Sequence, residues 1–299
     1  MHGWLVIDKP YGISSARAVA LVRRSSGAKK IGHAGTLDPL ATGILPLALG
    51  EATKTVQFVA AGKKRYRFRI RWGEARDTDD REGAIIAKTA ARPDAAAITA
   101  ALPAFSGAIL QRPPAYSAIQ IGGRRAYALA RAGKPPDLAA RVVEIAELRL
   151  ISVVDPDRAD FEAAVGAGTY IRALGRDLAQ ALGSLGHIAE LRRLAVGRFA
   201  ESQAISLDSA VALGHSLAAS EHLLPIETAL DDIPALALTA AEAARLRHGQ
   251  RVLPGDADER ARLGDIAQGT IVGARHDRLV IGLARIEDGA LRPVRIINR

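Results

Sequence analysis

The sequence predicts an α+β protein with a smaller, β-rich unit at its C-terminal end. In the segment 63–72, residues 65–72 alternate strictly between basic and apolar side chains, which is the pattern of a half-buried strand. Four apolar residues between positions 171 and 182 recur at helical spacing. In residues 236–299, glycines divide short apolar runs in the way that turns divide the strands of a small β-barrel. Sheet and helix are therefore both expected in the large N-terminal part, with a small barrel after it.

The N-terminal residues predict a strand followed by a helix. Residues 4–10 are mostly apolar and end at a proline, so we expect a short buried strand there. Ser14 or Ser15 is a suitable N-cap for a helix that continues to about Arg24. Residues 51–60 are compatible with a short helix or a strand.

Residues 30–46 combine turn-forming glycines and prolines with many apolar side chains. A solvated loop would not carry so much apolar surface, so we expect a buried or half-buried irregular segment. It holds one carboxylate, Asp38, which Pro39 directs away from helical angles. A single acid on such a rigid loop can have a controlled direction and pKa, as in an active site. It can equally be an aspartate that caps a turn, and the loop alone favours that second interpretation.

The strand expected at residues 63–72 has one apolar and one basic face. The apolar face must contact the core, and Tyr66, near the start of the strand, could project past the core edge into a cleft. The basic face should contact water or phosphate, and it consists of Arg65, Arg67, Arg69 and Arg71. The acidic residues 74–82 do not match a calcium-binding loop, so we expect a solvated turn there.

The remaining elements follow from apolar periodicity and turn residues. Residues 131–141 are polar and proline-rich, which predicts a mobile loop, and residues 201–235 are expected to mix helices and loops. Helices are expected at 94–102, 171–183 and 240–247, and strands at 142–154, 160–165, 269–275, 279–285 and 291–298. The composition changes near Pro234, which predicts two domains, residues 1–235 and 236–299.

Composition restricts the possible functions. The 299 residues are 48% hydrophobic, enough for a folded core, and they lack the run of about 18 apolar residues that would predict a membrane helix. The net charge of +9 favours a polyanionic partner, nucleic acid before membrane. Cysteine is absent, which excludes disulfides, thiolate metal sites and cysteine nucleophiles. The N-terminal residues lack a signal-peptide pattern, so a cytoplasmic protein is expected.

The side chains that remain for chemistry fit an enzyme that acts on a base of folded RNA. The Walker, dinucleotide-binding and zinc-protease motifs are all absent from the sequence. Because a base must be flipped out of its stack before chemistry can reach it, Tyr66 could stack on the base and His33 could fill the vacated space. Arg172 could supply the cation that a carboxylate such as Asp38 needs in a closed pocket. From the residues alone, this set is coherent but not unique.

The segment Gly32–Pro46, followed by Gly50-Glu51-Ala52-Thr53-Lys54, closely resembles the catalytic motif of the TruB family of pseudouridine synthases. Further motifs of that family match in the expected order along residues 1 to about 230. These are Ile7–Pro10 with Gly12 and Ser14-Ser15, Lys64–Tyr66, Asp77–Asp79 with Gly83, Pro113–Ala118, Gly168–Arg172 and His187–Arg193. Six ordered matches beside a long catalytic motif make coincidence implausible.

The resemblance implies a fold, an activity and a set of site residues. The fold would be a mixed, largely antiparallel sheet with flanking helices and loops. The enzyme would isomerise a uridine in the T-loop of tRNA, at position 55, to pseudouridine, with no metal or cofactor. By that similarity Asp38 is the catalytic carboxylate and Arg172 pairs with it. Substrate-binding roles would belong to Tyr66, which stacks on the flipped base, to His33, which takes its place, and to Tyr170, Leu191 and Lys9 in or near the pocket.

The resemblance also implies partners. Residues 236–299 resemble a PUA domain, which is an RNA-binding β-barrel, and residues 131–141 fall where the family has a loop that folds over RNA. The partner would be the T-arm of tRNA, and no guide RNA, no membrane and a monomeric state are expected. The alternative interpretation is an RNA-binding or tRNA-folding protein in which catalysis is secondary. A glycosidase with paired carboxylates is disfavoured, because only Asp38 has a constrained setting.

Overall fold

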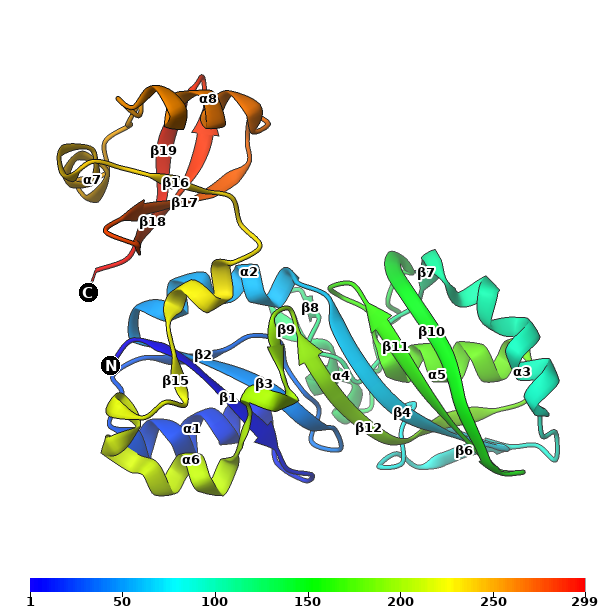
Figure 1. The fold of residues 1–299 in the computed structure, drawn as a ribbon. Coiled ribbons are helices and arrows are strands. Elements are labelled where there is room, and N and C mark those ends of the chain that lie inside the picture. The colour runs from blue at the N-terminus through cyan, green and yellow to red at the C-terminus, as the bar shows by residue number, and fades with distance from the viewer. Residues whose placement is uncertain (299) are drawn as a thin grey trace.

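The computed structural model describes residues 1–298, with the backbone alone of residue 262. An eleven-stranded sheet runs through its larger part (Figure 1). The main path has the order β14 (Ile205–Ser206), β1 (Gly3–Lys9), β3 (Thr42–Leu49), β12 (Gly186–Val196), β4 (Lys64–Trp72), β11 (Arg158–Val165), β10 (Arg141–Asp155) and β7 (Gly107–Gln111). Three short strands pair off this path: β2 (Ile31–His33) with β3, β15 (Leu223–Leu224) with β1, and β13 (Phe199–Ala200) with β12.

Two of these pairings, β1 with β14 and β3 with β12, are parallel, and the others are antiparallel. The predicted mixed, largely antiparallel sheet is therefore confirmed.

None of the helices in residues 1–298 is both long enough and apolar enough to cross a membrane.

The helices of the larger part lie beside this sheet. Helix α5 (Ile171–Ala181) packs on β12 and β4, whereas α1 (Ser15–Ser26) packs against α6 (Leu207–Leu213) and the short helix η4 (Gly214–Ala219) near β1 (Figure 1). The α-helices are α1 (Ser15–Ser26), α2 (Val56–Ala61), α3 (Ala95–Ala101), α4 (Ala126–Arg131), α5 (Ile171–Ala181) and α6 (Leu207–Leu213). The 3-10 helices are η1 (Gly50–Thr55), η2 (Leu102–Phe105), η3 (Glu201–Gln203), η4 (Gly214–Ala219) and η5 (Ile226–Leu230).

Strand β4 shows how the sequence pattern becomes packing. Its side chains alternate between buried and more exposed, as its alternating sequence predicts. On the buried face the ring of Phe68 stacks on Phe161 of β11, with centroids 5.5 Å apart. Gly175 lets α5 approach β12 closely, because a Cβ atom there would lie 2.7 Å from Ile188. The N-terminal end of α5 is thereby held over the sheet.

Two predicted loops are more ordered than expected. In the segment 30–46, residue 30 and residues 34–41 are irregular, whereas β2 occupies residues 31–33 and the first part of β3 begins at residue 42. Backbone pairing, which composition does not reveal, extends these ends into strands. The acidic turn 74–82 begins as β5 (Glu74–Arg76), which pairs with β6 (Ile85–Lys88).

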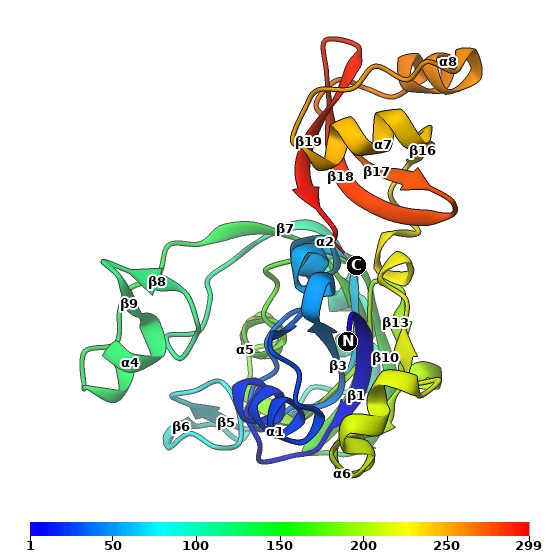
Figure 2. The same cartoon turned by 90° about the vertical axis from the view of Figure 1, so that its left-hand side faces the viewer.

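A small lobe carries α4 and the hairpin of β8 (Gln120–Ile121) and β9 (Arg124–Arg125). Figure 2 shows it standing away from the sheet, on the side where α5 and α1 lie. The loop predicted at 131–141 follows α4 and leads into β10.

The C-terminal part forms a second sheet with the order β16 (Ala235–Ala237), β17 (Ile271–His276), β18 (Leu279–Glu287) and β19 (Ala290–Ile296). Two helices accompany it: the predicted α7 (Ala240–Arg247) and α8 (Ala257–Asp265), which the sequence did not indicate to us. A small β unit is confirmed, but the expected barrel is wrong within the described residues, because β16 and β19 remain the edges of an open sheet. Glycine spacing predicts β17, β18 and β19, but neither the addition of β16 nor the open form of the sheet.

Side chains of the larger part fix this second sheet through its backbone. Lys54 Nζ donates to Ile296 O at 2.7 Å, and the Asn298 N–H donates to Glu51 Oε2 at 2.7 Å. The Val280 N–H donates to Glu227 Oε1 at 2.9 Å. Defined polar contacts therefore join the second sheet and Asn298, which lies after β19, to η1 and η5 of the larger part.

We expect Gly43→Ala to destabilise the protein strongly. Gly43 has φ +100°, and a Cβ atom there would lie 2.2 Å from the carbonyl oxygen of Arg193. Gly183→Ala is the matched control, because Gly183 also has positive φ (+68°) but open space around it. Urea unfolding should show a loss of about 1 kcal/mol for Gly183→Ala and of about 3 kcal/mol or more for Gly43→Ala. Equal losses would mean that the close approach of β3 and β12 is not a constraint.

Candidate active site

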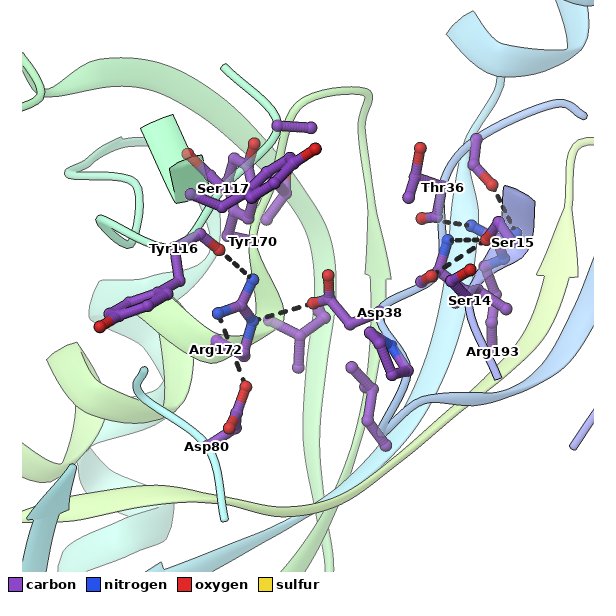
Figure 3. A pocket seen from close by; sticks show the side chains of 18 of the residues that line it. Ser14, Ser15, Thr36, Asp38, Asp80, Tyr116, Ser117, Tyr170, Arg172 and Arg193 are labelled. Atoms are coloured by element: carbon purple, nitrogen blue, oxygen red, sulfur yellow. Dashed lines mark hydrogen bonds and ion pairs between the residues drawn. The ribbon is translucent and has the colours of Figure 1, made fainter. Parts of the chain in front are cut away.

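A cavity of about 860 Å³ opens beside the Asp38 loop (residues 34–41), the N-terminal end of α5 and the lobe that carries α4 (Figure 3). Six of the seven predicted site residues line it: His33, Asp38, Tyr66, Tyr170, Arg172 and Leu191. They come from the end of β2, the Asp38 loop, β4, the start of α5 and β12. The structure thus brings together residues that are up to 158 positions apart, from His33 to Leu191.

Arg172 lies at the centre of the polar contacts in this cavity. Its Nε lies 2.9 Å from Asp38 Oδ2, and its side chain is only 4% exposed. Nη1 donates to Thr78 O at 2.8 Å, and Nη2 donates to Tyr116 O at 2.8 Å. The predicted pairing of Arg172 with Asp38 is present, and three more contacts fix the guanidinium in one orientation (Figure 3).

The third of those contacts is a second carboxylate, Asp80, which the sequence analysis placed in a solvated turn. That placement is wrong, because the Asp80 side chain is 5% exposed and its Oδ2 lies 3.6 Å from Arg172 Nη1. Asp80 Oδ1 accepts from Thr78 Oγ1 at 2.6 Å and from the Glu82 N–H at 3.0 Å. The sequence shows several aspartates in the turn that follows the strand predicted at residues 63–72. It does not show which of them faces the cavity.

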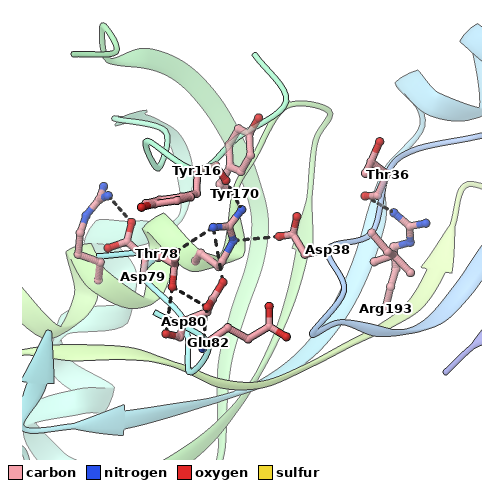
Figure 4. Close-up of polar contacts among 12 residues, drawn as sticks. Thr36, Asp38, Thr78, Asp79, Asp80, Glu82, Tyr116, Tyr170 and Arg193 are labelled. Carbon is pink, nitrogen blue, oxygen red and sulfur yellow. Dashed lines mark hydrogen bonds and ion pairs between the residues drawn. The ribbon is translucent and has the colours of Figure 1, made fainter. Parts of the chain in front are cut away.

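The neighbouring Asp79 points the other way (Figure 4). Its Oδ2 lies 2.7 Å from Arg176 Nη1, one turn along α5 from Arg172. Burial raises the pKa of Asp79 to about 6, against the opposing charges of Arg176 and Arg172. Two arginines of α5 therefore each hold one aspartate of the same loop, and only Asp80 faces the cavity.

Side chains of α1 and β12 hold the backbone of the Asp38 loop and of β3 next to it. Ser15 Oγ accepts from Leu37 N–H at 2.8 Å and donates to Leu37 O at 3.0 Å. Arg193, which is fully buried, donates from Nε to Ile44 O at 2.8 Å and from Nη2 to Gly35 O at 2.9 Å. Sequence reasoning named Ser15 only as a cap and gave Arg193 no role, because contacts from side chain to distant backbone leave no pattern in a sequence.

Lys9 does not line the cavity but lies beneath the Asp38 loop. Its Nζ donates to Pro10 O at 2.8 Å, to Ile13 O at 2.7 Å and to Pro39 O at 3.5 Å. Burial lowers the pKa of Lys9 to about 8, while the charge of Asp38 opposes this shift. The structure therefore supports Lys9 as a residue that positions the loop rather than as one that contacts a ligand.

The aromatic and apolar walls are also fixed. Gln111 clamps Tyr170, accepting from its N–H at 2.8 Å and donating to its carbonyl oxygen at 3.1 Å. Tyr66 projects from the buried face of β4, and Leu191 lies opposite its neighbour Phe68 in the ladder with β12. Burial, with a smaller contribution from the charge of Arg193, lowers the pKa of His33 and so favours the neutral form of its ring. A planar ligand can therefore enter between apolar and aromatic side chains next to a carboxylate.

Arg67 and Arg69, on the other face of β4, have carboxylate partners. Arg69 Nε lies 2.7 Å from Asp160 Oδ1, and Arg67 Nη2 lies 2.9 Å from Glu162 Oε1. Both arginines lie on the opposite face of the sheet from Tyr66. The expectation that this basic face binds phosphate is not supported for Arg67 and Arg69, because acids of β11 balance their charge. The sequence of β4 alone does not reveal which residues of a neighbouring strand will pair with it.

Solved structures show the class of fold. A Cbf5-Nop10-Gar1 complex contains a chain that matches with a TM-score of 0.76 over 99% of this chain and 85% of the matched chain, at 23% identity. An H/ACA RNP bound to a substrate RNA containing 2'-deoxyuridine gives a TM-score of 0.75 at 22% identity, with coverages of 99% and 85%. The architecture is the mixed α+β pseudouridine synthase fold.

Sequence comparison identifies the family. The model described as TruB family pseudouridylate synthase (N terminal domain) matches residues 23–171, and two C-terminal models, for tRNA pseudouridylate synthase B and for pseudouridine synthase II TruB, match residues 172–231 and 234–297. The chain is 52% identical to a tRNA pseudouridine synthase B of Rhodospirillum rubrum over 298 residues, covering 100% of this chain and 97% of that protein. A tRNA pseudouridine synthase B of Bradyrhizobium diazoefficiens is 53% identical over 303 residues, covering 100% and 86%. This chain belongs to the TruB family of pseudouridine synthases, so the resemblance seen in its motifs is confirmed.

We expect Arg172→Met to be much more destabilising than Arg67→Met. The first change leaves the buried charge of Asp80 and two carbonyl oxygens without their partner, which typically costs about 3–5 kcal/mol. The second removes a pair on the opposite face in which the arginine side chain is 58% exposed, and should cost at most about 1 kcal/mol. Urea unfolding of both variants provides the comparison. Similar losses would show that the contacts of Arg172 do not stabilise the fold beyond an ordinary surface pair.

Proposed function

We propose that this protein isomerises a uridine of tRNA to pseudouridine, with Asp38 as the catalytic carboxylate. The observation that carries the proposal is the Asp38–Arg172 pair of 2.9 Å at the wall of a cavity in a chain of this family. The relatives that share about half of its residues over their full alignment are named tRNA pseudouridine synthase B, which supports tRNA as the substrate.

The dimensions and exposure of the site are suitable for a flipped nucleotide. Ligand cavities for small molecules usually measure about 300–1,000 Å³, and this one measures about 860 Å³. The Asp38 side chain is 38% exposed although Oδ2 faces Arg172. One carboxylate oxygen is therefore accessible from the cavity while the other is held.

The reaction breaks the bond between ribose C1′ and uracil N1 and forms one between C1′ and C5. Uracil stays in the cavity and rotates between these steps, N1 gains a proton, and C5 loses one. Asp38 would start the reaction at the nucleotide, and we favour removal of the C2′ proton, which is returned after the new bond has formed. The rearrangement consumes no second substrate, so the residues of the cavity have to position and retain the uracil base.

The other predicted residues receive roles in this scheme. Tyr66 would stack on the flipped base and help to remove the C5 proton, and Tyr170 and Leu191 would enclose the base. Neutral His33 would occupy the place that the base leaves in the RNA. Lys9 would act indirectly, through the backbone of the Asp38 loop.

Several finer points belong to the same proposal. The target is position 55 in the T-loop, and the enzyme acts in the cytoplasm as a monomer without guide RNA. Residues 1–235 form the catalytic domain, and residues 236–299 form an RNA-binding domain resembling a PUA domain. The basic net charge of +9 supports an RNA substrate.

The test is release of tritium from C5 of uridine in unmodified tRNA. Wild type should release one equivalent, and Asp38→Asn should release none, because the amide can neither accept a proton nor attack. Binding of tRNA by Asp38→Asn should stay within a few-fold of wild type, since phosphate contacts dominate affinity. Asp160→Asn is the matched control: Asp160 also pairs with an arginine, at 2.7 Å, but on the opposite face of the sheet.

Each outcome separates the interpretations. Release by Asp38→Asn would remove Asp38 from catalysis. No release by wild type, with tRNA still bound, would favour the RNA-binding or tRNA-folding alternative. Loss of release in Asp160→Asn as well would mean that disruption of the sheet, rather than of the site, explains the first result.

A further inference from the structure

The buried basic residues around the cavity differ in whether their N–H groups are used. Both Nη atoms of Arg172 and all three side-chain nitrogens of Arg193 donate to carbonyl oxygens, Arg172 Nε forms an ion pair with Asp38, and Lys9 Nζ has three carbonyl oxygens. Lys64 is the exception, because its Nζ donates to Ala60 O alone among the described contacts. An ammonium group has three donors, so Lys64 retains two for a ligand.

Lys64 is well placed to use them. Its residue is 8% exposed and lines the same cavity as Asp38 and Tyr66. It is the first residue of β4, two positions before Tyr66, and both are on the buried face of that strand. Its Nζ therefore belongs to the wall of the cavity rather than to the outer basic face of β4.

The charge of Lys64 is also unbalanced. No ion pair between Lys64 and a carboxylate occurs in residues 1–298. Burial lowers the pKa of Lys64 to about 8, and the positive charge of Arg193 lowers it further in the same direction. A buried ammonium that lacks an anion is costly, and a bound anion would remove that cost. In the free protein, the positive charge of Lys64 at the wall of the cavity is thus not neutralised by an anion.

We propose that Lys64 is an anion subsite of the cavity and binds a backbone phosphate of the RNA next to the flipped nucleotide. This inference rests on the proposed function, because that function supplies the RNA. Alternate residues of a strand lie about 7 Å apart, which is comparable with the separation of a base from the phosphate of its own nucleotide. A base stacked on Tyr66 would therefore place an adjacent phosphate near Lys64.

The hydrogen bond to Ala60 offers another explanation, in which Lys64 only closes the end of α2. Lys64→Gln separates the two explanations, because glutamine can still donate to Ala60 O but carries no charge. Lys64→Arg keeps the charge. Lys63→Gln is the matched control, since Lys63 is exposed and does not line the cavity.

The experiment measures binding of a T-arm RNA hairpin by the full-length variants, with the phosphate on the 5′ or the 3′ side of the target uridine replaced by a neutral methylphosphonate. For one of the two linkages, wild type should bind about ten-fold more weakly than it binds the unmodified hairpin. Lys64→Gln should bind the unmodified hairpin about ten-fold more weakly, with no further loss for that linkage, as expected for two groups that interact. Its salt dependence should be about 0.7–0.9 less steep in log Kd against log salt. Lys64→Arg and Lys63→Gln should resemble wild type.

The outcomes that overturn the inference do not depend on the stability of a variant. Wild type that is insensitive to both linkages would refute it, as would Lys64→Gln that loses as much affinity as wild type for each linkage. Tritium release by wild type, measured on the unmodified hairpin, tests the proposed function separately. If wild type releases tritium but Lys64→Gln and the neutral linkage weaken binding independently, the subsite alone is refuted. If the two losses of affinity are not additive but no tritium is released, the proposed function alone is refuted.

Discussion

The guanidinium of Arg172 is the interaction on which the geometry of the cavity depends. It joins Asp38, the loop of Thr78 and Asp80, and the segment of Tyr116, none of which is adjacent to another in sequence. A planar guanidinium has fixed donor directions, so it orders these segments relative to one another as well as holding them. The position of Asp38 in the cavity is therefore a property of the assembled fold.

The main sheet provides the frame for this arrangement and keeps its two faces electrically distinct. On one face, acids of β11 balance the charges of Arg67 and Arg69 of β4. On the other, carbonyl oxygens satisfy Lys9 and Arg193, so these cations stabilise the Asp38 loop without neutralising its carboxylate. The charged side chains that pair on the outer face and those that lie next to the cavity are therefore separated by the backbone of the sheet.

Local patterns in the sequence predicted the helices and strands that depend mainly on residues close together in the chain. The alternation of β4, the helix from Ile171 and the helix at 240–247 were predicted from such patterns, and all three are present. The family motif added Asp38, Tyr66 and Arg172, which the structure brings together. Burial of Asp80, the carboxylate partners of Arg67 and Arg69, and the open second sheet were not predicted, because each depends on contacts between distant segments. Those contacts are decided by packing, which one sequence does not display.

The contacts that join the second sheet to the larger part have a consequence for how the protein can vary. Lys54, Glu51 and Glu227 of the larger part reach across to peptide groups, not to side chains, of the smaller one. Peptide groups are the same whatever residue carries them. The surface of the smaller part is thus free to diverge while its attachment to the rest of the molecule is preserved.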